Sequence, residues 1–150
     1  MKVFNKKAFF NYQLFERIEA GISLEGHEAK SVFLGRISLE GAYVQIKNGQ
    51  IYLINAVIPQ YEYARVFVYD PKRSRRLLLH KKEILSLETK MRQKNLILVP
   101  VSCYNKGRRI KIELALAKSK RKFEKKVAIK KRELDREAER ELNLKFKVKN

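Results

Sequence analysis

The sequence predicts a mainly β protein: a small closed antiparallel barrel with two or more flanking helices, followed by a basic, helix-prone tail. Three observations lead to this prediction. Apolar residues recur at period two over several short stretches, an Asn-Gly pair separates two of these stretches, and all 6 glycines and all 3 prolines of the 150 residues precede residue 118. Such alternation is typical of half-buried strands, and turn residues between short strands favour closed β architectures.

The first elements are a strand and a helix. Residues 12–22 alternate between apolar and polar side chains, and Gly21 is expected to mark a bend or bulge near the end of this strand. Residues 25–34 then form a short helix that ends before Gly35. A strand followed by a short helix is compatible with a barrel that carries a helix on its surface.

Two hairpins follow. Ala42, Val44 and Ile46 alternate up to Asn48-Gly49, and residues 51–54 return, so a type I′ turn is expected because Asn-Gly accepts positive φ. A second hairpin covers residues 96–117, with its turn at residues 105–107 and strict alternation in its return strand at Ile110, Ile112, Leu114 and Leu116.

A basic loop and a helix lie between the hairpins. The loop covers residues 70–76, and the helix places Ile84, Leu87 and Met91 on one face before it stops near Asn95. Five or six short strands with one or two such helices favour a barrel of the oligonucleotide-binding type over a flat sheet.

Two domains are expected, divided at residue 118. Residues 1–117 carry 21 basic and 10 acidic side chains (net +11), and residues 118–150 carry 14 and 6 (net +8). The second segment has no glycine, proline or tyrosine, and Arg132, Arg136 and Arg140 repeat at helical spacing. Because its apolar seam is narrow, this tail is expected to remain disordered or loosely helical until bound. The alternative is a helix docked permanently on the barrel.

The composition limits the classes of function. A net charge of +19 indicates a polyanionic partner, nucleic acid before an anionic membrane. Cys103 is the single cysteine, so no intrachain disulfide forms, and as part of an apolar strand it is expected to be core. No apolar run approaches the ~20 residues of a membrane span, and the first residues do not resemble a signal peptide, so a cytoplasmic protein is expected.

The features for catalysis are few and those for RNA binding are many. His27 and His80 stand apart, and no phosphate-binding glycine loop or metal-ligand spacing occurs, so neither an enzyme nor a cofactor is expected. Arg73, Arg75 and Arg76 follow Pro71 in the basic loop, where guanidinium groups can reach phosphates or stack on unpaired bases. Tyrosines offer stacking platforms, namely Tyr12, Tyr43 and Tyr104. Without a zinc finger or zipper pattern, shape-led RNA recognition is favoured.

An ordered set of short motifs resembles the SsrA-binding (SmpB) protein family. The matching stretches are Asn5-Lys6-Lys7-Ala8, Glu19-Ala20-Gly21-Ile22, Gly26-x-Glu28-x-Lys30-Ser31, Gly35, Tyr43, Asn48-Gly49, Asp70-Pro71-x-Arg73-x-Arg75-Arg76-Leu77-Leu78-Leu79, Lys82-Glu83-Ile84, Leu98-Val99-Pro100-Val101 and Ala115-x-Ala117-Lys118. The resemblance implies a protein that binds the tRNA-like domain of transfer-messenger RNA, enhances its alanylation and delivers it to stalled ribosomes. It further implies that the tail enters the decoding centre and message channel, against small-subunit ribosomal RNA.

The resemblance also implies the site residues. Family RNA contacts map onto Asn5, Glu19 and Leu78. The full set expected to bind transfer-messenger RNA is Asn5, Lys6, Lys7, Tyr12, Glu19, Lys30, Ser31, Arg73, Arg75, Leu78, Lys118, Lys120 and Arg121. The set expected to bind the ribosome is Phe123, Lys125, Lys126, Lys130, Arg132, Arg136 and Arg140. A monomer without a membrane partner or catalytic residues is expected.

Four positions depart from the family pattern: Phe33, Ser119, Glu124 and Lys126. Ser119 replaces a glycine and so disfavours a left-handed hinge, and Lys126 lacks the planar fork of arginine.

Alternatives remain open at this stage. Glu19 could instead form a strand salt bridge with Arg17 or Lys30, and Leu78 could be core. At the level of function, the alternatives are a permanently bound ribosome-assembly protein of the same fold and an RNA-processing enzyme that uses Glu19 or His80.

Overall fold

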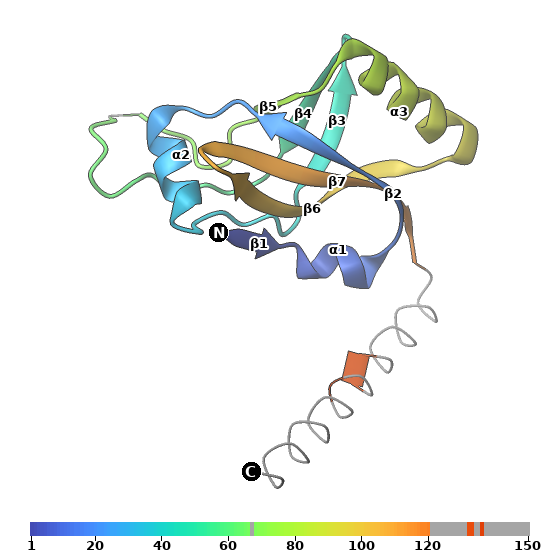
Figure 1. Cartoon of the computed structure of the whole chain (residues 1–150), viewed down its shortest axis with the longest axis horizontal. Helices are drawn as coiled ribbons and strands as arrows, with labels where there is room; N and C mark the ends of the chain where they lie inside the picture. Colours follow the sequence, from blue (N-terminus) through green and yellow to red (C-terminus); the bar gives the residue numbers. More distant parts are fainter. Residues whose placement is uncertain (67, 121–131, 134–135, 137–150) are drawn as a thin grey trace, which may run out of the picture. The chain divides into compact units, whose positions relative to one another are not determined.

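Seven strands of the first compact unit form one strongly curved sheet in the computed structural model (Figure 1). The structure describes residues 1–66, 68–120, 132–133 and 136. Contacts divide the chain into two units, Met1–Lys118 and Ser119–Asn150. In chain order, the helices and strands are β1 (Lys2–Phe4), α1 (Lys6–Asn11), β2 (Tyr12–Ile22), α2 (Gly26–Phe33), β3 (Tyr43–Lys47), β4 (Gln50–Ile54), β5 (Arg75–Leu78), α3 (Lys81–Lys94), β6 (Ile97–Lys106) and β7 (Arg109–Ser119).

The sheet has the order β1-β6-β7-β2-β5-β4-β3, so the expected mainly β fold of the oligonucleotide-binding type is confirmed, but its full closure is wrong. The end strand β3 lies against β6 without joining it in the hydrogen-bonded order. The physical reason lies at Asn5. Its Nδ2 donates to the Pro100 carbonyl (2.8 Å) and its backbone N–H to the Val101 carbonyl (2.8 Å). These acceptors of β6 are therefore occupied, and Pro100 has no N–H to offer a further strand.

The first hairpin forms as predicted. Lys47 pairs with Gln50 across a two-residue turn in which Asn48 (φ 52°) and Gly49 (φ 74°) take positive φ. The second hairpin also forms, but its turn lies at Gly107 and Arg108, because residues 105 and 106 pair in the ladder with Ile110 and Arg109.

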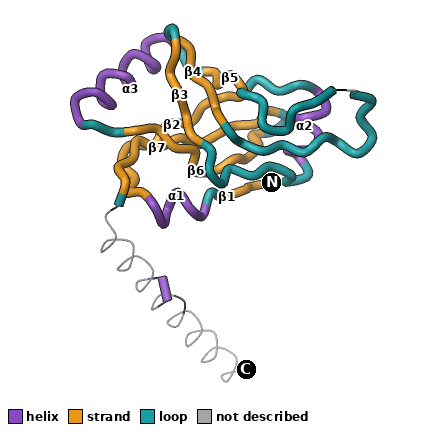
Figure 2. The backbone as a smooth tube through the Cα atoms, turned by 180° about the vertical axis from the view of Figure 1, so that it is seen from behind, coloured by secondary structure: helices purple, strands orange, loops and turns teal. Residues whose placement is uncertain are grey.

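Helices α2 and α3 lie at opposite ends of the sheet (Figures 1 and 2). A capping box starts α2: the Glu25 and Glu28 side chains each accept from the other's backbone N–H. Asn95 ends α3 with a left-handed φ of 51°, as its sequence signal predicted. Ile84 and Leu87 of α3 are buried in the core.

Gly21 lies within β2, paired in register with Leu78 of β5. The expectation of a loop that extends to residue 76 is wrong. Arg75 and Arg76 lie in β5 rather than in a loop, with Arg75 facing inward and Arg76 outward. The core residues of these strands and their neighbours are fully buried, among them Ile51, Leu53, Leu77, Leu98, Ile112 and Leu114. Cys103 belongs to this core, and burial raises the pKa of its thiol to about 12.

Candidate nucleic-acid interface

A surface hollow of about 340 Å³ brings two of the predicted RNA contacts, Glu19 and Leu78, to one place. A second hollow of about 490 Å³ adjoins it, and Gly21, Leu78 and Lys111 line both. The first hollow is polar, and its other lining residues are Arg76, Leu77, Leu79, His80 and Glu83. The second has an apolar floor and a basic rim, formed by Ile22, Leu24, Ala29, Arg108, Arg109 and Ile110.

Leu78 stands between the two hollows with half of its surface (51%) exposed, so it is not a core residue. Strand alternation explains this, because its neighbour Leu77 points into the core. The backbone of Gly21 lies directly opposite, and a Cβ built there would be 3.2 Å from the Cβ of Leu78. The glycine thus allows the leucine to lie low across β2, where its side chain offers an apolar surface to a ligand.

Glu19 is held in place by two side chains of β6. The Tyr104 hydroxyl donates to Oε2, and the Lys106 ammonium lies 2.9 Å from Oε2 and 3.1 Å from Oε1. The hydrogen bonds from Tyr104 and then Lys106 lower the pKa of Glu19, which is therefore ionised at neutral pH. The alternative of a strand salt bridge at Glu19 is met by Lys106 and not by Arg17 or Lys30. Arg17 pairs instead with Glu113 at 3.0 Å.

Basic side chains surround this site from separate strands. Arg76 and Lys111 line the polar hollow, while Arg108 and Arg109 line the apolar one. The sequence marks residues 106–111 as a basic run but gives no sign that it faces Glu19, since Tyr104 and Glu19 are 85 positions apart.

A third hollow, of about 560 Å³, lies beside α1. Asn5, Lys7 and Tyr12 line it together with Glu40 and Tyr43. Lys6 and Lys7 are exposed, and Lys7 forms an ion pair with Glu40 at 2.6 Å. Asn5 itself is 6% exposed, and its Oδ1 also accepts from the Ala8 N–H as the cap of α1. Its side chain therefore fastens α1 to β6, while the residue also lines the hollow.

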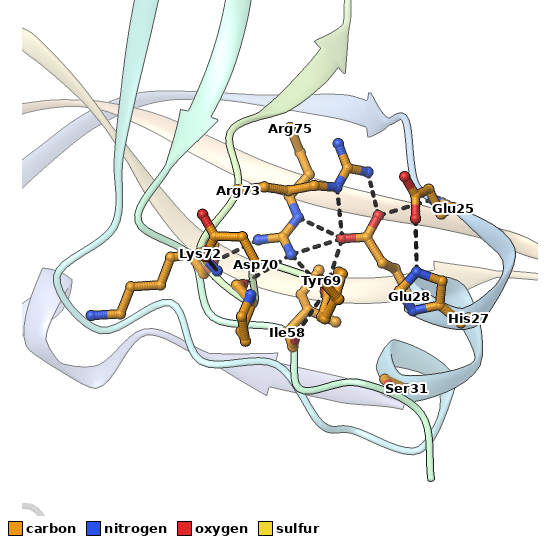
Figure 3. Close-up of polar contacts among 12 residues, drawn as sticks. Glu25, His27, Glu28, Ser31, Ile58, Tyr69, Asp70, Lys72, Arg73 and Arg75 are labelled. Carbon is orange, nitrogen blue, oxygen red and sulfur yellow. Dashed lines mark hydrogen bonds and ion pairs between the residues drawn. The ribbon is translucent and has the colours of Figure 1, made fainter. Parts of the chain in front are cut away.

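A buried polar cluster surrounds Glu28 (Figure 3). Its Oε2 accepts from Nε (2.9 Å) and Nη2 (2.7 Å) of Arg75, and both of its oxygens accept from Arg73. The Tyr69 hydroxyl donates to Glu28 at 3.0 Å. Burial alone would raise the pKa of Glu28, but the hydrogen bonds from Arg73, the Glu25 backbone and Arg75 outweigh it and lower the pKa to about 2.

This cluster contradicts the predicted RNA contact at Arg75, and it also holds Arg73. Arg75 has no exposed surface, and its guanidinium also donates to the Ala56 (2.6 Å) and Pro71 (3.0 Å) carbonyls. Each of its three guanidinium nitrogens donates to a protein acceptor, and the side chain is fully buried, so Arg75 has no exposed group to offer RNA. One third of the Arg73 side chain is exposed, but its fork is bound to Glu28. Both arginines tie the 55–74 segment to α2.

Of the two RNA contacts predicted on α2, Ser31 is buried and Lys30 is exposed. Ser31 is buried, and its Oγ donates to the Pro59 carbonyl at 2.8 Å, again fastening the segment after β4. Lys30 is exposed, with its ammonium 5.4 Å from the centroid of the Tyr61 ring. Phe33, a departure from the family pattern, is exposed at the end of the helix.

Few of the tail predictions fall on described residues. Lys118 is exposed at the end of β7, Ser119 completes that strand, and Lys120 is half-buried. Arg132 and Arg136 are helical and exposed. The remaining predicted positions lie outside the described residues: Arg121, Phe123, Glu124, Lys125, Lys126, Lys130 and Arg140.

Every described helix is too short or too polar to span a bilayer. Among the described residues, no three histidine, cysteine or acidic side chains gather as a metal site would require.

Comparison with known proteins gives a consistent result. Residues 2–144 match the family model described as "SmpB protein". The SsrA-binding protein of Carboxydothermus hydrogenoformans is 44% identical over 142 residues, covering 95% of each chain, and that of Chlorobaculum tepidum is 47% identical, covering 89% of this chain and 85% of the relative. A chain in the solved structure described as "tmRNA-SmpB: a journey to the center of the bacterial ribosome" is 38% identical with a TM-score of 0.67, covering 85% of this chain and 94% of that one.

Proposed function

The chain belongs to the SmpB protein family, and we propose that it binds transfer-messenger RNA and delivers it to stalled ribosomes. The observation that carries this proposal is the match over residues 2–144, which extends through the sheet and most of the tail. The similar solved chain is described with the same RNA and the bacterial ribosome. The protein acts by binding, without catalytic residues of its own, in the cytoplasm where ribosomes work.

The RNA-binding face is the pair of hollows on either side of Leu78. Glu19 accepts hydrogen bonds from the RNA, Leu78 packs against a base, and Arg76, Arg108 and Lys111 neutralise nearby phosphates. These residues line the two adjoining hollows and come from β2, β5, β7 and the turn between β6 and β7.

The other proposed contacts lie around this face or support it. Lys6, Lys7 and Lys30 are exposed, so their ammonium groups can approach phosphate oxygens. Lys7 would first leave its exposed ion pair with Glu40, and such surface pairs are weak. Tyr12, in the third hollow, offers a ring for stacking. Asn5, Ser31, Arg73 and Arg75 support the face from within by holding α1 and the 55–74 segment in position.

The tail is the second functional part. Residues 118–150 carry a net charge of +8, and we assign them to ribosomal RNA in the decoding centre and message channel, with Lys118, Lys120 and Arg121 beside the tRNA-like domain. The ribosomal contacts proposed are Phe123, Lys125, Lys126, Lys130, Arg132, Arg136 and Arg140.

Sequencing the RNA that co-purifies with the full-length chain tests the function directly. Transfer-messenger RNA should be enriched over total RNA. A ribosome-assembly protein would instead remain on ribosomal subunits at high salt with no such enrichment, and that result would refute the proposal.

Truncation after Lys120 tests the division between the two parts, since it keeps all of β7. The truncated chain should still bind the tRNA-like domain but lose the tagging of stalled peptides. If RNA binding is lost as well, the tail is not a separate functional part.

A pair of leucines tests the RNA-binding face. Leu78→Ala should weaken RNA binding, whereas Leu85→Ala on α3, an equally exposed leucine (55% against 51%), should not. Equal effects of the two substitutions would show that the face is elsewhere.

A further inference from the structure

A loop beside α2 presents two tyrosines at the end of the sheet (Figures 1 and 2). We name residues 59–66 the tyrosine loop, after Tyr61 and Tyr63. Tyr63 is 76% exposed, more than any other tyrosine or phenylalanine that the structure describes. A ring so exposed adds little to the core, and tyrosine rings of this kind are typical of interfaces.

Hydrogen bonds fix the shape of the tyrosine loop without any ligand. The Ala64 N–H closes a turn on the Tyr61 carbonyl at 2.9 Å. Across the loop, Gln60 Nε2 donates to the Val66 carbonyl at 3.1 Å. The loop begins at the carbonyl that Ser31 of α2 binds at 2.8 Å. Because these bonds order the backbone beforehand, a ligand that binds here pays little of the cost of ordering a loop.

Tyr61 orients the exposed ring of Tyr63. The two ring centroids are 5.6 Å apart with the planes at 66°, which is the edge-on arrangement that aromatic pairs prefer. On Tyr61 the Lys30 ammonium lies 5.4 Å from the ring centroid. Tyr61 therefore has a neighbour on α2 and a neighbour in the loop, while most of the Tyr63 ring stays open to a flat partner.

The charges around this ring favour a polyanion. Lys30 and Arg65 are exposed, and neither forms an ion pair with a described carboxylate. The tyrosine loop holds one acidic side chain, Glu62, so the loop and Lys30 together carry a net positive charge. An open aromatic ring between free cations is the arrangement with which proteins stack unpaired bases and bind the adjacent phosphates.

Helix α2 connects the tyrosine loop with the RNA-binding face. Ala29 of this helix lines the apolar hollow, and the next residue, Lys30, places its ammonium over Tyr61. An RNA that occupies the apolar hollow can therefore continue over α2 to the loop. This continuity favours the RNA of that face, the tRNA-like domain, over a protein or ribosomal RNA.

We propose that Tyr63 is a stacking site for an unpaired base of the tRNA-like domain, beyond α2 from the two hollows. The proposal rests on the proposed function and extends the RNA-binding face by one contact. Tyr63 contacts the base, Tyr61 positions its ring, and Lys30 and Arg65 neutralise the flanking phosphates. Since every base has a flat face, the site accepts any of the four.

Two substitutions of Tyr63 separate the ring from its hydroxyl and from mere apolar bulk. In titrations of the full-length chain with the tRNA-like domain, Tyr63→Leu should weaken binding about tenfold, within the range for one base stacked on an aromatic ring. Tyr63→Phe keeps the ring and should stay within about twofold of the wild type. Val68→Ala, a nearby apolar position that is 92% exposed, is the control and should bind as the wild type does.

Three results of this titration would overturn the stacking site: wild-type binding by Tyr63→Leu, equal losses in Tyr63→Leu and Tyr63→Phe, or a tenfold loss in Val68→Ala. Urea unfolding of each variant shows that the fold is kept. If the wild type binds and Tyr63→Leu binds equally well, the stacking site alone is refuted. If the wild type does not bind the tRNA-like domain, the proposed function is refuted as well.

Salt dependence distinguishes stacking from charge. Tyr63→Leu should lower the affinity by the same factor at about 50 and 200 mM salt, because a stacked ring releases no counterions. Lys30→Gln should instead reduce the slope of log K against log salt concentration by roughly 0.7–0.9, the value for one phosphate contact. A reduced slope in Tyr63→Leu would show that the loop acts through its charges, against the proposal.

Photo-cross-linking identifies the partner of the ring. The variant Tyr63→benzoylphenylalanine is irradiated in the full-length chain bound to transfer-messenger RNA and ribosomes. The cross-link should map to an unpaired nucleotide of the tRNA-like domain. Cross-links confined to ribosomal RNA or to a protein would assign the tyrosine loop to that partner and overturn the proposal.

Discussion

Replacing Glu28 with glutamine should strongly destabilise the folded chain. The substitution keeps the size of the side chain but removes its charge, and it turns one acceptor oxygen into a donor that faces Arg73 and Arg75. Both Glu28 and Arg75 are fully buried, so no water can replace the lost partner.

The pKa of Glu28 gives the magnitude of this effect. It lies at about 2 in the folded chain, against an ordinary value of 4.5. Since one pKa unit corresponds to about 1.4 kcal/mol, the ionised carboxylate stabilises the fold by roughly 3 kcal/mol at neutral pH. The free energy lost when the buried guanidinium of Arg75 is left without a counter-charge is of similar size, about 3–5 kcal/mol.

The sign of the pH dependence follows from the lowered pKa. Stabilisation by Glu28 is present above pH 4.5 and is lost as the pH falls from 4.5 towards 2, where the folded carboxyl takes up its proton. The loss of stability over this interval should therefore be about 3 kcal/mol smaller in Glu28→Gln than in the wild type.

Urea unfolding followed by circular dichroism at a series of pH values measures both effects. Glu62→Gln, an exposed carboxylate of the same segment, is the control and should stay within about 0.5 kcal/mol of the wild type. A Glu28→Gln variant within about 1 kcal/mol of the wild type at pH 7, or with an unchanged acid profile, would refute the role of this ion pair.

Three further predictions concern single positions. Gly21→Ala should weaken RNA binding more than it affects stability, because a Cβ 3.2 Å from that of Leu78 displaces this leucine; parallel titration and urea unfolding would separate the two. Asn5→Ala should lower the free energy of unfolding by about 1–3 kcal/mol, through loss of the helix cap and of the bond to Pro100, and a variant with wild-type stability but weak RNA binding would contradict the structural role. Cys103 should react with a thiol reagent only on unfolding, since its thiol is buried with a pKa of about 12, and rapid labelling of the native chain would contradict this.

The positions proposed to bind RNA differ in how far along the chain their contact partners lie. The sequence motifs locate Glu19 and Leu78, but the partners of Glu19 come from positions 104 and 106, which no local pattern connects with it. Arg75 shows the opposite case: a basic run after a proline predicts an exposed arginine, yet its partner Glu28, 47 residues earlier, draws it into the core. A buried charge pair cannot be inferred from composition, because either residue alone is typical of a surface.

The local sequence predicted the structure correctly where a single turn or a short hydrophobic repeat determines it. Asn48-Gly49 closes its hairpin because both residues tolerate positive φ, and Asn95 ends α3 for the same reason. The sequence by itself also determined the mainly β class and the division of charge, +11 and +8, between residues 1–117 and 118–150. Only the tertiary structure decided that the sheet stays open at Asn5 and that Leu78 stands over Gly21 beside Glu19, because these depend on contacts between strands far apart in the chain.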